Sequence, residues 1–138
     1  MSTREEQLKS FNRLLDILAQ LRQKCPWDSK QTSQSLRPNT IEEVFELSDA
    51  IMRGDSKEEC KELGDVLMHV CFYAMFAEEK GEFDFAEVCN RLCEKLIFRH
   101  PHIYGNVEAV TADAVEDTWE QIKQKEKEWA VLEVLINN

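Results

Sequence analysis

The sequence predicts an all-α fold, a bundle of about five helices. Apolar residues recur at steps of three and four over long stretches, which is the period of an amphipathic helix. Glycine and proline are scarce, with 4 and 3 residues among 138, as expected of long helices joined by few tight turns. No segment shows the strict alternation that is typical of a strand. A chain of this length is expected to form one domain, residues 1–138.

The first helix is expected from about Arg4 to Gln23. Its core-facing stripe is formed by Leu8, Phe11, Leu14, Leu15, Leu18 and Leu21. Pro26 ends this helix, because a proline disfavours helical backbone at the residue before it. Residues 29–39 are polar and contain Pro38, so we expect an ordered loop or a single turn there.

A second helix is expected to begin at Thr40, because Thr40 and Glu43 form the Thr-x-x-Glu pattern of a capping box. Its apolar and acidic residues fall on opposite faces. The apolar face is predicted to hold Ile41, Val44, Ser48 and Ile51, and the other face Glu42, Glu46 and Asp49. A turn signal at residues 54–56 separates this helix from the next one.

A third helix is expected from about Lys57 to Lys80. Beyond Asp65 it is apolar on nearly all sides, which predicts a central helix covered on several sides. Glu62 and Asp65 lie at the entrance to this apolar stretch, where an uncompensated charge would be costly. Gly81 is a natural residue to follow the C-terminus of the helix.

A fourth helix is expected over about residues 85–99, capped by Asp84. Its inward residues are predicted to be Val88, Leu92 and Leu96. Cys89 and Cys93 share one face of it and resemble half of a zinc site. No second Cys/His pair with zinc-site spacing accompanies them, so core packing is the favoured interpretation of both.

A last helix is expected from Asp113 to about Leu135, after a break over residues 99–105. Its acidic residues precede its lysines, the order that suits the helix dipole. The stretch 129–138 is interpreted as a linker or a frayed end.

Composition excludes several classes of function. The net charge of −10 argues against binding to a nucleic-acid polymer, which needs a basic surface. No run of about 18 apolar residues is present, so no membrane span is expected, and no apolar signal segment follows the N-terminal residues. The odd count of five cysteines fits reduced thiols better than a disulfide framework. We therefore expect a cytoplasmic protein.

Two acidic pairs, Glu43/Glu46 and Glu62/Asp65, carry the strongest functional signal. Residues three apart project from the same face of a helix. If the two helices fold back antiparallel, four carboxylates converge on one small volume and repel each other. A divalent cation is the simplest compensation, because Mg²⁺ prefers a few carboxylates together with waters and substrate phosphates. The pattern predicts a metal-dependent enzyme that acts on a phosphate compound.

Ordinary explanations compete with this one. Either pair alone also fits a solvated helix face or i,i+4 salt bridges, and Glu43 also fits a helix cap. A di-iron site in the bundle would need Glu-x-x-His motifs, and neither pair is one. Oxygen-only ligands favour Mg²⁺ or Mn²⁺ over iron or zinc.

Five further residues have both a functional and a structural interpretation. His69 follows Asp65 by one helical turn, and we interpret it as a partly buried, hydrogen-bonded histidine rather than a ligand. Trp27 fits stacking on a base or a plug at the end of the bundle. Arg99, His100 and His102 fit contacts to phosphate or the closing of a helix C-terminus.

Six segments are most informative as an ordered set. They are Leu21-Arg22-x-x-Cys25-Pro26-Trp27-Asp28-x-x-Gln31-Thr32, Glu42-Glu43-x-x-Glu46, Glu62-Leu63-Gly64-Asp65, Gly81-x-Phe83-Asp84-Phe85, Arg99-His100-Pro101-His102 and Trp119-x-x-x-Lys123-x-x-Glu126-Lys127. In these segments, from about residue 8 to 128, the chain resembles the MazG family of nucleoside triphosphate pyrophosphohydrolases. The acidic core is typical of the wider all-α pyrophosphohydrolase superfamily, and the Cys-Pro-Trp-Asp and Arg-His-Pro-His pieces narrow it to MazG. Well-known longer members carry two such copies, whereas this chain has one, which leaves the nucleotide preference open.

The resemblance implies hydrolysis of a nucleoside triphosphate between the α and β phosphates, giving a monophosphate and pyrophosphate, as in housecleaning of the nucleotide pool. It implies Mg²⁺, with Mn²⁺ as a substitute, and a homodimer or higher homo-oligomer in which helices of both subunits frame each site. The implied metal ligands are Glu43, Glu46, Glu62 and Asp65. All five acids, these four and Glu42, are expected to be catalytic, and either Glu42 or Glu46 is expected to orient the attacking water or take its proton. The implied substrate-binding residues are Trp27, Arg99, His100, Lys123 and Lys127.

Two rival hypotheses follow from the same residues. A non-catalytic helical interaction module could use the acidic faces to bind a basic partner, and it would release no pyrophosphate from any nucleotide. A hydrolase of alarmones related to ppGpp is an enzymatic rival, and the sequence leaves it open as a side activity.

Overall fold

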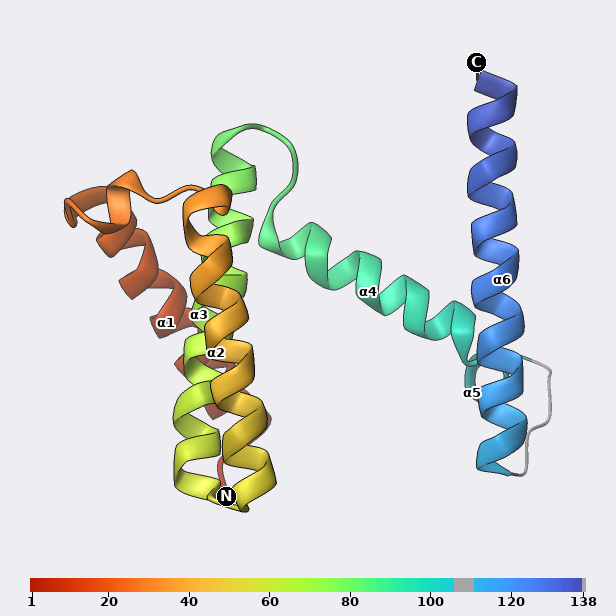
Figure 1. Cartoon of the computed structure of the whole chain (residues 1–138), viewed down its shortest axis with the longest axis horizontal. Coiled ribbons are helices and arrows are strands. Elements are labelled where there is room, and N and C mark those ends of the chain that lie inside the picture. Colours follow the sequence, from red (N-terminus) through yellow and green to blue (C-terminus); the bar gives the residue numbers. More distant parts are fainter. Residues whose placement is uncertain (106–110, 138) are drawn as a thin grey trace. The chain divides into compact units, whose positions relative to one another are not determined.

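The computed structural model describes residues 1–105 and 111–137 (Figure 1). Its elements are α1 (Arg4–Lys24), the 3-10 helix η1 (Asp28–Lys30), α2 (Ser33–Arg53), α3 (Ser56–Glu79), α4 (Phe85–Arg99), α5 (Pro101–Tyr104) and α6 (Ala112–Asn137). The described residues contain no strand, so the all-α prediction is confirmed. None of the described helices has the length and apolar character needed to cross a membrane.

The chain divides into two compact units, Met1–Phe85 and Ala86–Asn138. Each unit is a separate cluster of helices and is described by itself. The assignment of residues 1–138 to one domain stays a prediction.

A hairpin of α2 and α3 is the main feature of the first unit. Gly54 adopts the left-handed conformation (φ 68°), and its N–H donates to the carbonyls of Ala50 and Ile51. Asp55 then caps α3 by accepting a hydrogen bond from the N–H of Glu58. The chain therefore reverses within two residues, and the two helices lie side by side (Figure 1).

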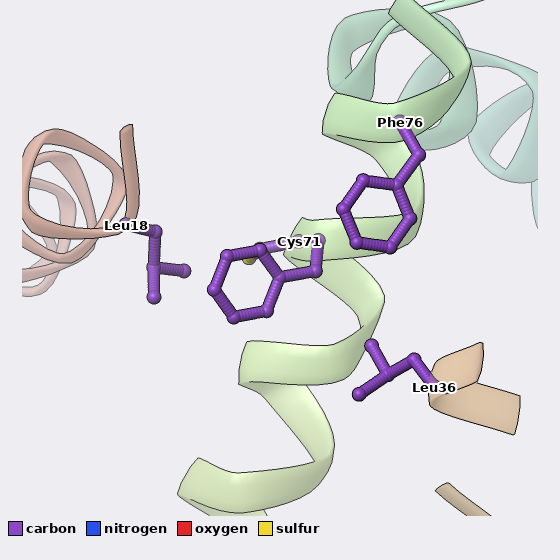
Figure 2. Close-up of a cluster of buried hydrophobic side chains, with 5 residues drawn as sticks. Leu18, Leu36, Cys71 and Phe76 are labelled. Carbon is purple, nitrogen blue, oxygen red and sulfur yellow. The ribbon is translucent and has the colours of Figure 1, made fainter. Parts of the chain in front are cut away.

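The core of this unit lies between α1, the first turn of α2 and the second half of α3 (Figure 2). Its buried members are Leu18, Leu36, Cys71, Phe72 and Phe76. The predicted stripe of α1 is confirmed in its middle, where Phe11, Leu14 and Leu15 pack against this cluster. Leu8 and Leu21 lie outside it and are exposed.

The start of α2 corrects the sequence analysis. Residues 33–39 are helical rather than a loop, and Thr40 is not the N-cap. Thr32 caps α2 and forms a capping box with Ser35. That cap, together with the burial of Leu36, outweighs the backbone donor that Pro38 lacks inside the helix.

The hairpin leaves apolar surface uncovered within its own unit. Ile41, Val44 and Ile51 of the predicted apolar face are each about half exposed. The third helix matches its predicted bounds to within one residue, and its second half is buried as predicted. It is not covered on all sides, since Leu63 and Leu67 in its first half and Val70 early in its second half are exposed.

The second unit contains α4 from Ala86 onward, α5 and α6. The predicted bounds of α4 are confirmed, but Leu92 and Leu96 do not point into a core of this unit and are exposed. The same exposure makes the predicted core packing of Cys89 and Cys93 wrong.

The last helix ends two residues beyond its predicted end at Leu135, because α6 continues to Asn137. The interpretation of residues 129–138 as a linker or a frayed end stays a prediction. Within this stretch the Trp129 ring lies 6.1 Å from the Phe98 ring, and this contact joins α6 to α4.

Candidate active site

Three carboxylates from the two helices of the hairpin meet at one point. Glu43 of α2 and Glu62 and Asp65 of α3 each offer an oxygen, and these oxygens lie within 4.8 Å of one another. The convergence follows from the sequence, since i,i+3 spacing places Glu62 and Asp65 on one face and the tight turn folds that face toward α2.

The acidic group is partly dehydrated. Glu62 is only 5% exposed, and the Oε2 atoms of Glu43 and Glu62 are buried without a hydrogen-bond partner among the described residues. Burial of its carboxylate raises the pKa of Glu43 to about 7. A hydrogen bond to Glu62 and the negative charges of Glu46 and Asp65 act in the same direction.

A hard divalent cation fits this donor set. The Nζ atom of Lys61 lies 3.8 Å from Oε1 of Glu62 but is itself mostly exposed, so it compensates little of the charge. Buried, unpartnered carboxylate oxygens are the ligands that Mg²⁺ and Mn²⁺ prefer.

The other two predicted acids lie at the edge of this group. Glu46 is exposed and does not belong to the set of three, although its charge contributes to the raised pKa of Glu43. Glu42 and Glu46 both line an open groove of about 510 Å³, together with other residues of α2 and with Glu62 of α3. Glu42 also lines a second, more enclosed cavity, so it stands between the two spaces.

The enclosed cavity has a volume of about 330 Å³ and lies beside the acidic group. It is lined by Trp27, Asp28, Gln31, Leu36, Asn39, Glu42, Glu43, Met68, His69 and Phe72. The structure thus brings the predicted substrate residue Trp27 to the same cavity as two predicted site acids. Trp27 is 56% exposed, which leaves its ring available to a ligand.

The sequence analysis assigned no role to several residues that line this cavity. Asp28, Gln31 and Asn39 received no role, although Asp28 and Gln31 belong to the Cys-Pro-Trp-Asp segment that drew attention to Trp27. His69 is a buried, hydrogen-bonded histidine outside the group of three carboxylates, as predicted. Its position in the cavity wall was not expected, and helical spacing from Asp65 was the only available signal.

Arg22 holds the loop that forms one side of the cavity. Its Nη1 donates to the backbone carbonyls of Asp28 and Gln31 at 2.7 and 2.8 Å. Its guanidinium also binds Glu79 of α3 and lies 4.5 Å from the centre of the Phe76 ring. Arg22 therefore ties the loop that carries Trp27 to α1 and α3, in addition to the hydrogen bond from Nε2 of Gln31 to the Trp27 carbonyl within the loop.

The predicted basic residues belong to the second unit. Arg99 forms an ion pair with Glu126 and lies 5.5 Å from the centre of the Trp119 ring. Nδ1 of His100 bonds to the carbonyl of Leu96 at 2.6 Å, and its ring meets Trp119 edge-on.

The two lysines of α6 that are predicted to bind substrate are less constrained. Lys123 lies 3.8 Å from Glu120, and Lys127 is exposed. The roles of Arg99, His100, Lys123 and Lys127 in binding phosphate stay predictions.

Comparison with known proteins adds independent information. Residues 31–104 match the family model of the MazG nucleotide pyrophosphohydrolase domain. The nucleoside triphosphate pyrophosphohydrolase of Escherichia coli K12 is 42% identical over 123 residues, which cover 87% of this chain and 47% of that protein. The nucleoside triphosphate pyrophosphohydrolase/pyrophosphatase MazG of Thermotoga maritima is 43% identical over 119 residues, covering 85% and 45%. The chain spans about half the length of these relatives.

A solved structure agrees in fold. The crystal structure of a mazG-related protein from Thermotoga maritima is similar with a TM-score of 0.70 and 26% sequence identity, covering 82% of this chain and 98% of that one. The family model matches more than half of the sequence and includes every carboxylate of the acidic group. The chain belongs to the MazG family of nucleotide pyrophosphohydrolases.

Proposed function

We propose that this chain hydrolyses nucleoside triphosphates between the α and β phosphates, giving a nucleoside monophosphate and pyrophosphate. The relatives named nucleoside triphosphate pyrophosphohydrolase support this activity. The observation that carries the proposal is the meeting of Glu43, Glu62 and Asp65, with two oxygens buried and unpartnered. Such a group is unfavourable by itself and is explained by a bound cation.

Glu43, Glu62 and Asp65 would hold Mg²⁺, or Mn²⁺ in its place, with Glu46 as a fourth ligand at the exposed edge. When bound, the cation neutralises phosphate charge and lowers the pKa of a coordinated water. Glu42 is exposed between the groove and the cavity, where its carboxylate can orient a water or accept its proton.

The position of Trp27 supports binding of the nucleoside portion of the substrate in the enclosed cavity. Its exposed ring forms part of the cavity that Glu43 also lines, so a base stacked on Trp27 would leave the triphosphate near the acidic group. Arg99, His100, Lys123 and Lys127 are proposed to neutralise phosphate oxygens. The ion pair with Glu126 would hold the Arg99 guanidinium in one orientation.

A homodimer, or a higher homo-oligomer, is proposed as the working form. Apolar side chains of α2 and α3 that their own unit leaves exposed are Ile41, Val44, Phe45, Ile51, Met52, Leu63, Leu67 and Val70. Exposed apolar side chains in this number on two adjacent helices suggest an interface, and closed symmetric oligomers are the commonest way to cover one. None of the five cysteines, all of which lie in the described part of the chain, forms a disulfide, which supports the cytoplasmic location expected from the sequence.

A pyrophosphate-release panel tests the activity. The full chain is incubated with canonical and modified nucleoside triphosphates in Mg²⁺ or Mn²⁺, and the nucleotide product is separated by chromatography. We expect pyrophosphate and monophosphate in equal amounts, whereas diphosphate plus orthophosphate would refute α–β cleavage. Adding ppGpp to the panel tests the alarmone alternative.

Site variants connect the activity to the acidic group. We expect Glu43→Gln and Asp65→Asn to lower turnover by at least about 100-fold with an unchanged helical circular dichroism signal. Glu5→Gln is the matched control, because Glu5 is an exposed carboxylate on α1. Near-normal activity in both site variants would place the chemistry elsewhere. No pyrophosphate release from any nucleotide, with no metal-dependent thermal shift, would favour the interaction module.

A further inference from the structure

A polar cluster behind the cavity takes no part in the proposed metal chemistry. Oγ1 of Thr40 lies 2.7 Å from Nδ1 of His69 and 2.5 Å from the hydroxyl of Tyr73. Thr40 comes from the middle of α2, and the other two residues are one turn apart on α3. Thr40 thus connects the two helices of the hairpin through polar atoms.

The hydrogen-bond partners indicate an assignment of the protons. Among the hydrogen bonds of the described residues, Oγ1 of Thr40 is the acceptor available to the Tyr73 hydroxyl, so we assign Tyr73 as the donor to Thr40. The Thr40 proton then has two possible acceptors, Nδ1 of His69 at 2.7 Å and the carbonyl of Leu36 at 3.3 Å. We assign this proton to the contact with Nδ1 of His69, because it is the shorter of the two.

This order of donors determines the other nitrogen of the ring. Burial lowers the pKa of His69, with the charge of Asp65 acting in the opposite direction, so the ring is neutral at pH 7. A neutral ring whose Nδ1 accepts carries its proton on Nε2. His69 is 4% exposed and lines the 330 Å³ cavity, and no acceptor for Nε2 is found among the described residues. The Nε2–H is left to donate into the cavity.

The cavity suits a nucleobase better than a phosphate at this position. Trp27, Leu36, Met68 and Phe72 give it flat or apolar walls, and the Asp28 carboxylate would repel an anion. The neutral imidazole of His69 can donate one directed hydrogen bond from Nε2 to an acceptor atom of the ligand, and it adds no positive charge to the cavity.

We propose that His69 is a specificity-determining residue, whose Nε2–H donates to an acceptor atom on the nucleobase of the bound nucleotide. Thr40 and Tyr73 are positioning residues that fix the tautomer and orientation of the ring. The inference rests on the proposed function for the identity of the ligand, because it takes the cavity occupant to be the nucleoside portion of the substrate.

Two amide substitutions of His69 distinguish the roles of its two ring nitrogens. His69→Asn places an amide near Nδ1, which keeps the contact with Thr40 and removes the group that faces the cavity. His69→Gln places an amide donor near Nε2 and gives up the contact with Thr40. The dissociation constants of an α,β-methylene nucleoside triphosphate, which cannot be cleaved at that bond, are measured for the full chain and both variants. The same measurement is made with ribose 5′-(α,β-methylene)triphosphate, a control ligand that lacks the base.

We expect His69→Asn to bind the nucleotide about tenfold more weakly than the wild type, as for one lost hydrogen bond. His69→Gln should stay within about threefold. Neither change should alter binding of the ribose ligand by more than about twofold. An unchanged dissociation constant in His69→Asn, an equal loss in His69→Gln, or an equal loss with the ribose ligand would each overturn the proposal, as would a wild type that binds neither ligand. Because binding is measured without turnover, failure of the hydrolysis assay alone refutes the proposed function and leaves this result interpretable.

Discussion

Arg22 and Glu79 form a two-pronged ion pair that joins the C-terminal ends of α1 and α3. Nε and Nη2 of Arg22 donate to the two carboxylate oxygens of Glu79, each at 2.8 Å. The hydrogen bond from Arg22 holds the pKa of Glu79 below its usual value. The third guanidinium nitrogen, Nη1, donates to the carbonyls of Asp28 and Gln31. One side chain therefore connects this loop with α1 and α3.

Replacing Arg22 should destabilise the protein more than removing the charge of its partner. The Arg22 side chain is 18% exposed, and Arg22→Met leaves two loop carbonyls without their donor. We expect a loss of about 2–4 kcal/mol in the free energy of unfolding, measured with urea and circular dichroism. The Glu79 side chain is 48% exposed, so Glu79→Gln should cost about 1 kcal/mol or less.

Arg13→Met is the control, since Arg13 is an exposed arginine on the same helix. If it destabilises the protein as much as Arg22→Met, the loop contacts are not the cause. The loop also carries Trp27 and Asp28, so we expect Arg22→Met to raise KM for a nucleotide more than it lowers kcat. A change in kcat alone would contradict this positioning role.

The metal-free protein should become less stable as the pH rises from about 4.5 to about 7. In this range the folded protein keeps a proton on Glu43, whose pKa is raised to about 7, while the unfolded chain has lost it. Because the folded state binds the proton more tightly, deprotonation favours unfolding. The measurement is the urea midpoint at several pH values in the presence of EDTA.

Glu43→Gln should reduce this pH dependence, because the amide does not titrate. Mg²⁺ should oppose it, since a carboxylate must lose its proton before it binds metal, and stabilisation by Mg²⁺ should therefore grow from pH 5 to pH 8. Equal stabilisation by Mg²⁺ at both pH values would argue against Glu43 as a ligand.

The helices with strong local signals could be predicted from the sequence. The bounds of α1, α3 and α4 agree to within about one residue, because apolar periodicity, a glycine turn and a proline stop are all local features. The burial of Glu62 could also be predicted, since it directly precedes the apolar part of α3.

The start of α2 could not be predicted, because residues 29–39 are polar and Pro38 argues locally against a helix. The burial of Leu36 against residues of α1 and α3, which decides the outcome, is a tertiary effect. The same limit applies to Arg22 and Glu79, which are 57 positions apart in the sequence. Periodicity also identifies which face of α2 is apolar without revealing what covers it.

The hydroxyl of Thr40 should stabilise the hairpin. Thr40→Val keeps the shape of the side chain but leaves Nδ1 of His69 and the Tyr73 hydroxyl without their partner. We expect a loss of about 1–3 kcal/mol in the free energy of unfolding. Thr40→Ser retains the hydroxyl and should cost less than about 1 kcal/mol. Equal losses in the two variants would show that the methyl group, and not the hydroxyl, is responsible.

Charged substitutions on the exposed face of α2 should dissociate the proposed oligomer. Phe45 is 71% exposed and Met52 is 83% exposed, although side chains of this size are costly to leave in water. We expect the wild type to sediment as a dimer or larger assembly, and Phe45→Asp and Met52→Asp to shift it toward the monomer. Leu8→Asp is the control, because Leu8 is an exposed apolar residue on α1. A monomeric wild type, or an unchanged mass in both α2 variants, would mean that this face is not covered by a second copy of the chain.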